Sequence, residues 1–150
     1  MSDAQKAKLL GAWQLQIYGV LIDGEPRPGV LGENPVGLLM YTADGYMSAL
    51  MMSADRPVLR APSLAAADDA GALAAARSCI AYSGRFDVIG DQVQHHVMNA
   101  VLPDWVGQTL VRSIGWEDGR LILSPPDEWT SSGKRVQRAL TWRRADTGLG

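Results

Sequence analysis

Short apolar runs separated by turn-forming residues recur along this chain, and they restrict its fold more than any other feature of the sequence. Asp44-Gly45 separates the apolar runs 36–42 and 46–53. Aspartate followed by glycine between two such runs is a strong hairpin signal, because both central positions of a type I′ turn need positive φ. Gly90-Asp91 and Asp118-Gly119 divide later runs in the same way. The pattern predicts an all-β chain built of antiparallel hairpins.

Eight strands follow from this division. In the first, the apolar residues Trp13, Leu15 and Ile17 recur at period two, as expected of a half-buried strand. The predicted strands cover residues 13–22, 36–42, 46–53, 80–89, 92–102, 108–117, 120–124 and 134–144. An alanine-rich segment after Ser63 predicts one helix over 64–78, between the third and fourth strands, with Ser63 as its N-cap.

Short antiparallel strands of this number form either an up-and-down barrel or a sandwich. We favour the barrel, because closing the sheet removes exposed edges and eight strands enclose room for one small ligand or for filling side chains. The connection 54–79 is long for a hairpin, and long connections in compact barrels are often lids or binding loops. It is predicted to cover one mouth of the barrel.

Composition narrows the classes of partner. The 150 residues contain 14 Lys and Arg against 16 Asp and Glu, and we expect one domain over residues 1–150. A formal net charge of −2 gives no basic surface for nucleic acid, and no apolar run is long enough for a signal peptide or a membrane span. A cytoplasmic location follows by default. Cys79 is the only cysteine, and His95 and His96 are adjacent, so neither a disulfide nor a metal site built from these residues is expected.

Residues at both ends of the chain resemble a known family. Gly11-Ala12-Trp13 matches the Gly-x-Trp start of lipocalins and their calycin relatives, and Arg143-Arg144 supplies the arginine that packs over that tryptophan. More specifically, the chain resembles the bacterial lipocalin-like domain family, through blocks in fitting order at 9–13, 37–48, 81–84, 95–97, 103–107 and Arg112. The resemblance implies a calycin-type barrel that serves as a carrier in some relatives and as a cofactor-free cyclase or isomerase in others.

Strand parity predicts which side chains enter the barrel. On strand 92–102 the odd positions are more apolar than the even ones, so His95 is predicted to face inward and His96 outward. The same test on three consecutive strands gives a set of inward-facing polar and aromatic residues: Tyr82, Phe86, His95, Asn99, Arg112 and Trp116. A buried guanidinium needs a partner, and no acidic residue shares this parity. The missing anion belongs to a ligand, or else Arg112 reaches an interior carbonyl, a water or Asp104.

Two functions remain open on these residues. In the first, the chain is a cofactor-free isomerase, cyclase or lyase for a small, partly apolar, carbonyl- or phenol-bearing molecule. His95 or Tyr82 would then move a proton while Arg112 holds developing negative charge. The alternative is a non-catalytic carrier for a small hydrophobic, acidic ligand, with Arg112 as its anchor. Further ligand-binding candidates are Asn99, Trp116, Phe86, Tyr41, Met40 and Trp105. A homodimer is left open, as is a filled barrel that works through its outer surface.

Overall fold

The computed structural model describes residues 2–145 and is built mainly of β-strands. The helical segments are α1 (Ser2–Leu9), η1 (Leu64–Ala66), α2 (Asp69–Arg77) and η2 (Pro103–Trp105). The long strands are β1 (Gly11–Ile22), β3 (Pro35–Tyr41), β4 (Tyr46–Ser53), β5 (Cys79–Ile89), β6 (Gln92–Ala100), β7 (Thr109–Glu117), β8 (Arg120–Ser124) and β10 (Arg135–Arg144). Two-residue strands β2 (Glu25–Pro26) and β9 (Glu128–Trp129) extend the sheet at β1 and β10.

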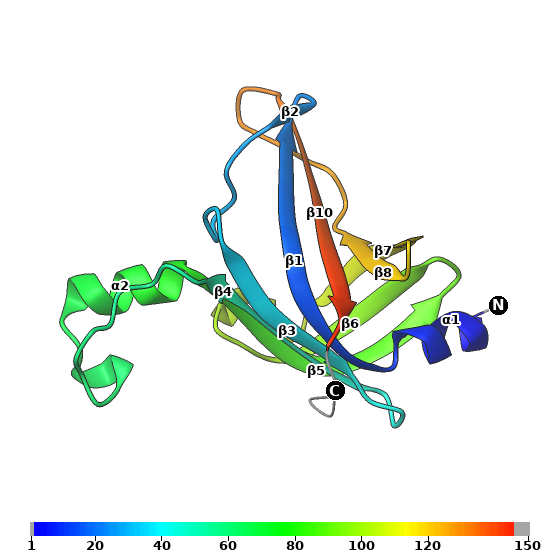
Figure 1. Cartoon of the computed structure of the whole chain (residues 1–150), viewed down its shortest axis with the longest axis horizontal. Coiled ribbons are helices and arrows are strands. Elements are labelled where there is room, and N and C mark those ends of the chain that lie inside the picture. The colour runs from blue at the N-terminus through cyan, green and yellow to red at the C-terminus, as the bar shows by residue number, and fades with distance from the viewer. Residues whose placement is uncertain (1, 146–150) are drawn as a thin grey trace.

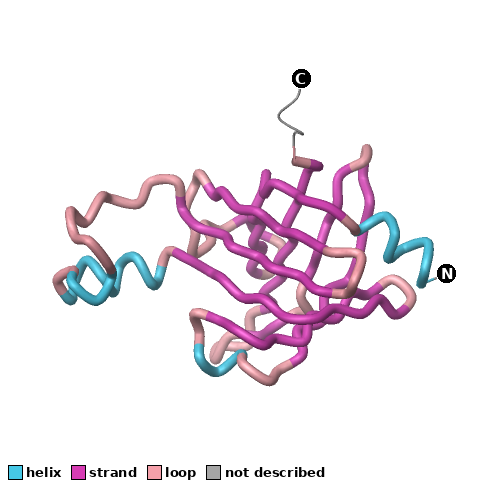
Figure 2. Tube along the Cα trace, turned by 90° about the horizontal axis from the view of Figure 1, so that it is seen from below, coloured by secondary structure: helices cyan, strands magenta, loops and turns pink. Residues whose placement is uncertain are grey.

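The eight long strands close into an antiparallel barrel. They follow the order β1-β3-β4-β5-β6-β7-β8-β10, and β1 also pairs with β10 from Trp13 opposite Arg144 to Ile22 opposite Val136. The strands wrap around a common interior, with α1 and α2 on opposite sides (Figure 2). Barrel, strand order and a helix between β4 and β5 are confirmed as predicted.

Because neighbouring strands run in opposite directions, the short turns lie at one end of the barrel and the long connections at the other. The β3–β4, β5–β6 and β7–β8 turns lie at one end of the barrel, whereas the longer connections before β3, β5, β7 and β10 lie at the other. Asp118 and Gly119 both have positive φ, as a type I′ turn requires. At the β3–β4 hairpin only Gly45 has positive φ, so the type I′ prediction for Asp44-Gly45 was wrong. Residues 42–45 join the strands there, and the Thr42 amide donates to the Tyr46 carbonyl.

Helix α1 closes the end with the short turns. Its last residue, Leu9, accepts a hydrogen bond from the Trp13 indole nitrogen at 2.9 Å. The Arg144 guanidinium lies 4.0 Å from the centre of the Trp13 ring and donates to backbone carbonyls of residues 8 and 10. Lys8 covers the ring of Trp116 in the same way, at 4.1 Å. Trp13 and Arg144 therefore stabilise the closed end, by a cation–π contact of roughly 0.5–2 kcal/mol together with hydrogen bonds.

Two β-bulges change which residues face inward. In β1, Gln16 has no partner in β10, and beyond it Ile17 is half exposed while Tyr18 turns inward. In β6, Met98 is the extra residue. Asn99 is therefore exposed, which corrects the inward direction predicted for it. One inserted residue shifts a strand by one position, and every later side chain changes face.

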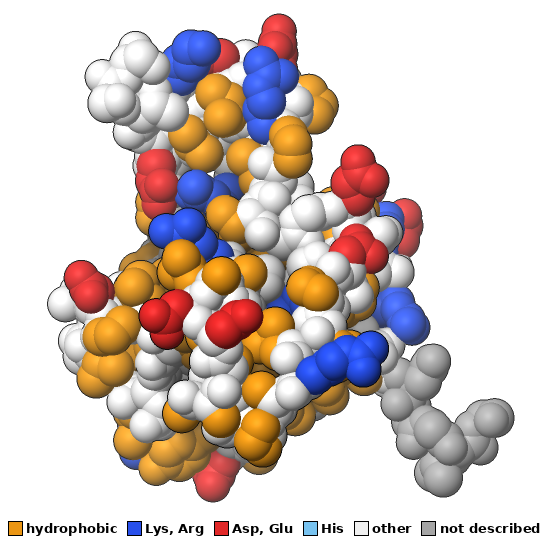
Figure 3. Space-filling view, turned by 90° about the vertical axis from the view of Figure 1, so that its left-hand side faces the viewer, with side chains coloured by type: hydrophobic (Ala, Val, Ile, Leu, Met, Phe, Trp, Pro, Cys, Tyr) orange, Lys and Arg blue, Asp and Glu red, His pale blue; other side chains and the backbone are white. Residues whose placement is uncertain are grey.

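The segment between β4 and β5 extends away from the barrel (Figure 1). It holds η1, which Ser63 caps, and α2, which Asp68 caps, so the helix predicted over 64–78 begins at Asp69. None of its residues lines the barrel's cavity, and the prediction that it covers a mouth was wrong. Arg56 donates to the Ala75 carbonyl and holds the segment together. On the side of the molecule from which this segment extends, hydrophobic, acidic and basic side chains are interspersed (Figure 3).

None of the helices within residues 2–145 has the length and apolar character to cross a membrane.

The bulge in β6 predicts a strong effect of one methyl group. A Cβ built on Gly84 would lie 1.9 Å from the His96 carbonyl oxygen, whereas one built on Gly115 would meet Ile122 at an ordinary 3.7 Å. We expect Gly84→Ala to lower the free energy of unfolding by roughly 1–3 kcal/mol, because backbone must move. Gly115→Ala is the matched control and should change it by less than about 1 kcal/mol. Urea unfolding measures both, and equal losses would contradict the close approach at the bulge.

Candidate functional site

The barrel encloses a cavity of about 600 Å³. Most of its wall is apolar, formed by side chains such as Leu39, Met51 and Leu123. Its outer part is formed by residues 28–30 and 125–128, which belong to the long connections. The cavity therefore opens at the end opposite α1. Its volume falls within the range of small-molecule sites, about 300–1,000 Å³.

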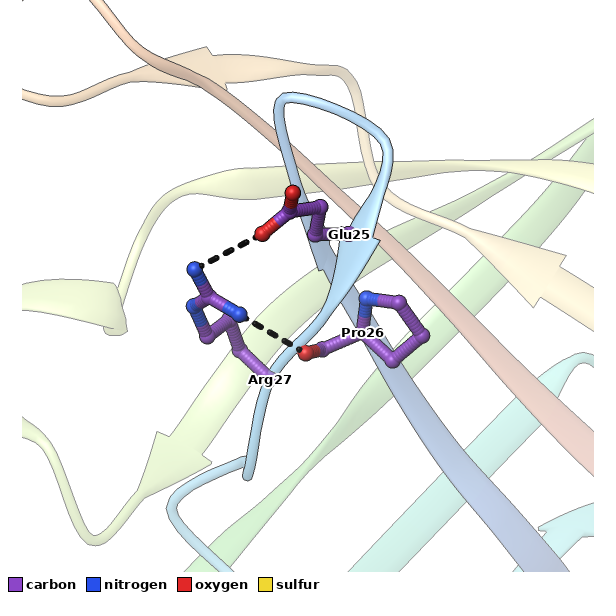
Figure 4. Close-up of polar contacts among 3 residues, drawn as sticks. All are labelled: Glu25, Pro26 and Arg27. Atoms are coloured by element: carbon purple, nitrogen blue, oxygen red, sulfur yellow. Dashed lines mark hydrogen bonds and ion pairs between the residues drawn. The ribbon is translucent and has the colours of Figure 1, made fainter.

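The loop after β2 forms one side of the mouth. The Arg27 amide donates to the Val20 carbonyl at 3.0 Å, which holds residues 28–30 beside the opening. The Arg27 guanidinium forms an ion pair with Glu25 at 3.0 Å and donates to the Pro26 carbonyl at 3.2 Å (Figure 4). These side-chain contacts are solvent-exposed, and exposed ion pairs contribute little. The backbone hydrogen bond therefore does more to place the loop.

Polar side chains from three consecutive strands meet on the cavity wall. Tyr82 comes from β5, His95 from β6 and Arg112 from β7, and all three line the cavity. Trp105, from η2, also lines it and stands edge-on to Tyr82, with ring centres 5.5 Å apart. The structure thus brings together the three residues to which the sequence hypothesis assigned chemistry.

His95 is 1% exposed and lies between two tyrosine hydroxyls. Its Nε2 is 2.7 Å from the Tyr41 hydroxyl, and its Nδ1 is 2.9 Å from the Tyr82 hydroxyl. Burial lowers the pKa of His95 to about 3, and the positive charge of Arg112 acts in the same direction. The imidazole is therefore neutral at neutral pH, with one N–H donor and one acceptor nitrogen.

Both tyrosines that contact His95 are protonated at neutral pH. Burial raises the pKa of Tyr41 well above its ordinary value, and the neighbouring Tyr82 adds to this rise. Burial also raises the pKa of Tyr82, while the charge of Arg112 and a hydrogen bond from its guanidinium act in the opposite direction. The three side chains form an uncharged hydrogen-bonded chain from the core to the cavity.

Arg112 has no carboxylate partner within residues 2–145. Its Nη1 donates to the Val111 carbonyl at 2.9 Å, and none of the ion pairs between described residues includes it. The acidic residues at the mouth are paired elsewhere: Asp127 with Arg135 and Glu128 with Arg138. Arg112 therefore keeps a positive charge beside a largely apolar cavity.

The other residues proposed for the ligand site lie outside the cavity. Asn99 is exposed and donates to Ser83, and Met40 is 43% exposed on the outer face of β3. Phe86 and Trp116 do point inward, but they lie next to α1, where Lys6 and Lys8 cover their rings. Tyr41 is 2% exposed and does not line the cavity, although it contacts His95.

Other cavity residues were not singled out from the sequence. Tyr18 turns inward only because of the bulge at Gln16, which alternation alone does not reveal. Trp142 lines the cavity, and its indole nitrogen has no hydrogen-bond partner among the described residues. The signal available for Trp142 was its period-two relation to Leu140, which also lines the cavity.

His96 lies on the outer face, as strand parity predicts. Its Nε2 is 2.9 Å from Asp87 and its Nδ1 is 3.0 Å from the Thr109 hydroxyl. Within residues 2–145 there is no group of three histidine, cysteine or acidic side chains that could hold a metal ion.

A closed eight-stranded antiparallel barrel around an internal cavity defines the class of barrel proteins that bind small molecules inside the sheet. Within that class, the chain belongs to the lipocalin-like domain family, whose family model matches residues 10–145. The match confirms the family that the sequence blocks resemble. No curated protein and no solved structure matches the chain.

The lowered pKa of His95 predicts an acid-dependent loss of stability. Between pH 6.5, the ordinary value, and about 3, the unfolded chain holds a proton on this imidazole that the folded chain does not. The free energy of unfolding should therefore fall as the pH drops through this window, by up to about 1.4 kcal/mol per pH unit from this group. Denaturant unfolding at several pH values should show a shallower pH slope for His95→Gln than for the parent, whereas the control Asn99→Ala, at an exposed and non-titrating position of the same strand, should keep the slope. Equal slopes for parent and His95→Gln would contradict a buried, neutral His95.

Proposed function

We propose that this protein binds a small, largely apolar molecule that carries a negatively charged or strongly polarised oxygen, and that Arg112 anchors that oxygen inside the barrel. The observation that carries the proposal is a guanidinium on the wall of an apolar cavity without a carboxylate partner in the described chain. Charged groups in such surroundings are stable only with hydrogen-bonding or ionic partners. Arg112 has hydrogen-bond partners in Val111 and Tyr82, but both are neutral, and a ligand oxyanion would supply the counterion that the cavity wall lacks.

The shape and lining of the cavity support the same reading. Leu39, Met51 and Leu123 provide apolar surface, and Trp105 adds an aromatic ring next to Tyr82. Burying a ligand's apolar body against such surface contributes roughly 25 cal/mol per Å². Arg112 and Tyr82 lie side by side on one wall of the cavity. The ligand's charged oxygen would therefore face that wall, and this fixes the orientation of the ligand.

A cofactor-free isomerase, cyclase or lyase reaction is the second candidate, and the contact between Arg112 and Tyr82 favours it. Tyr82 would give its proton to the substrate oxygen on which negative charge develops, and Arg112 would stabilise the phenolate left on Tyr82. The pKa values of His95 and Tyr82 nevertheless favour binding over catalysis as the main function. An imidazole with a pKa of about 3 is a weak base at neutral pH, and burial makes Tyr82 a weaker acid than free tyrosine. Binding needs neither group to change its protonation state.

A pair of fluorescent probes tests the proposed anchor. 1-Anilinonaphthalene-8-sulfonate is an aromatic anion, and N-phenyl-1-naphthylamine has the same ring system without the sulfonate. We expect Arg112→Leu to weaken sulfonate binding by about 10- to 100-fold, the range for hydrogen bonds to charged groups. Binding of the neutral probe should change by less than about threefold, because its contacts are apolar.

Arg85→Leu is the matched control, since Arg85 lies on the outer face of β5. It should leave both probe affinities unchanged. Thermal unfolding of each variant separates anchoring from folding: removing a charge without a protein counterion should leave the melting temperature of Arg112→Leu near that of the parent. Equal weakening of both probes, or a large fall in melting temperature, would instead assign Arg112 to the structure of the barrel.

A further inference from the structure

We propose that Tyr41, which does not line the cavity, is a positioning residue for the ligand site. Through hydrogen bonds it fixes which nitrogen of His95 carries the proton, and this turns the hydroxyl hydrogen of Tyr82 toward the ligand. The inference rests on the proposed binding function and assigns its ligand a chemical class. Geometry carries it: three side chains on three strands form one continuous hydrogen-bonded chain.

The series of hydrogen bonds begins in the core of the barrel, at Tyr41. Tyr41 is 2% exposed and packs edge-on against Phe86, with ring centres 4.7 Å apart. Its hydroxyl lies 2.7 Å from His95 Nε2, and no other polar partner of this hydroxyl occurs within residues 2–145. A buried O–H without an acceptor bears the full cost of its desolvation. Tyr41 therefore donates its hydrogen to Nε2, which must present a lone pair.

The next step follows from the chemistry of neutral imidazole. With a lone pair on Nε2, the single N–H of His95 lies on Nδ1. Nδ1 is 2.9 Å from the Tyr82 hydroxyl oxygen, so the nitrogen donates and this oxygen accepts. A buried histidine surrounded by two tyrosine rings and the Arg112 charge stays neutral, as the lowered pKa of His95 also indicates.

The last step sets the polarity of the site. Because the Tyr82 oxygen accepts from Nδ1, its own hydrogen is not used by His95, and Tyr82 lines the cavity. Together with the Arg112 guanidinium, the site then presents donors to a bound molecule. Such a site suits a group that only accepts hydrogen bonds, such as a carboxylate, sulfonate or enolate oxygen. An ammonium group, which can only donate, would place donors against donors.

The tautomer of His95 can be measured without any ligand. The chain has two histidines, so the variant His96→Gln leaves one imidazole to assign. Long-range ¹H–¹⁵N correlation spectra at neutral pH should show a protonated Nδ1 and an unprotonated Nε2. Free histidine prefers the opposite tautomer, so this result is not the default. A proton on Nε2 would overturn the proposal, and the measurement does not require a mutated cavity.

A double-mutant cycle tests the link to the ligand. Tyr41→Phe keeps the ring and removes the hydroxyl, so nothing holds the lone pair on Nε2. Each neutral tautomer of His95 then leaves one nitrogen without a partner, and in the Nε2–H form Nδ1 takes the Tyr82 hydrogen. We expect affinity for 1-anilinonaphthalene-8-sulfonate to fall by about fivefold in Tyr41→Phe and in Tyr82→Phe. The double variant should be no weaker than Tyr82→Phe alone, because Tyr41 acts only through Tyr82.

Two further results separate the possible failures. Leu121→Val, a core change on β8, controls for general loosening and should leave affinity and tautomer unchanged. Additive losses in the double variant would show that Tyr41 acts through packing and would overturn its positioning role. No sulfonate binding by the parent would overturn the proposed function, whereas the tautomer spectrum would still decide where the Tyr82 hydrogen lies.

Discussion

Closure of the sheet between β1 and β10 is the constraint on which the rest of the structure depends. Without this pairing, both strands would expose an edge of unpaired backbone groups, and the interior would be one face of an open sheet. With this pairing, every second side chain of each strand points into a closed interior, and the two ends of the barrel differ in structure. One end is sealed by α1 over Trp13, while the long connections leave the other open to the cavity.

The interior contains three uncharged, hydrogen-bonded side chains and one arginine whose charge has no carboxylate partner among the described residues. Tyr41, His95 and Tyr82 satisfy one another, so the barrel buries three polar side chains without burying a charge. Arg112 differs, because its hydrogen bonds go to neutral groups, Val111 and Tyr82. A site of this kind discriminates between ligands through charge at one point and through apolar contact elsewhere. That division would account for the binding proposed above without requiring a group that titrates near neutral pH.

Hairpin signals and strand parity were enough to predict the barrel and the direction of Tyr82, His95 and Arg112. Parity failed beyond the bulge at Met98, where Asn99 turns outward, because one extra residue in a strand leaves no mark on local alternation. The connection 54–79 is held by contacts within itself, from the Asp68 cap and from Arg56 to Ala75, and its length alone does not show whether it covers the barrel.

The contribution proposed for Tyr41 depends on a side-chain contact between β3 and β6, two strands that are not neighbours in the sheet. Its hydroxyl meets His95, 54 positions away, across the barrel interior. Phe86 and Trp116 show a similar limit of the sequence. Strand parity predicts that they point inward, but it does not predict at which end of the barrel they lie. Their depth follows from strand register and from α1, whose polar sequence carried no signal that it would cover the barrel.

A crystal structure of the protein with bound 1-anilinonaphthalene-8-sulfonate tests the central claim most directly. The account predicts the sulfonate within hydrogen-bonding distance of both the Arg112 guanidinium and the Tyr82 hydroxyl, about 2.7–3.2 Å, with the aromatic rings along the apolar wall. A probe bound on the outer face of β3 and β4, or inside the barrel with its sulfonate directed at the mouth and away from Arg112, would contradict it.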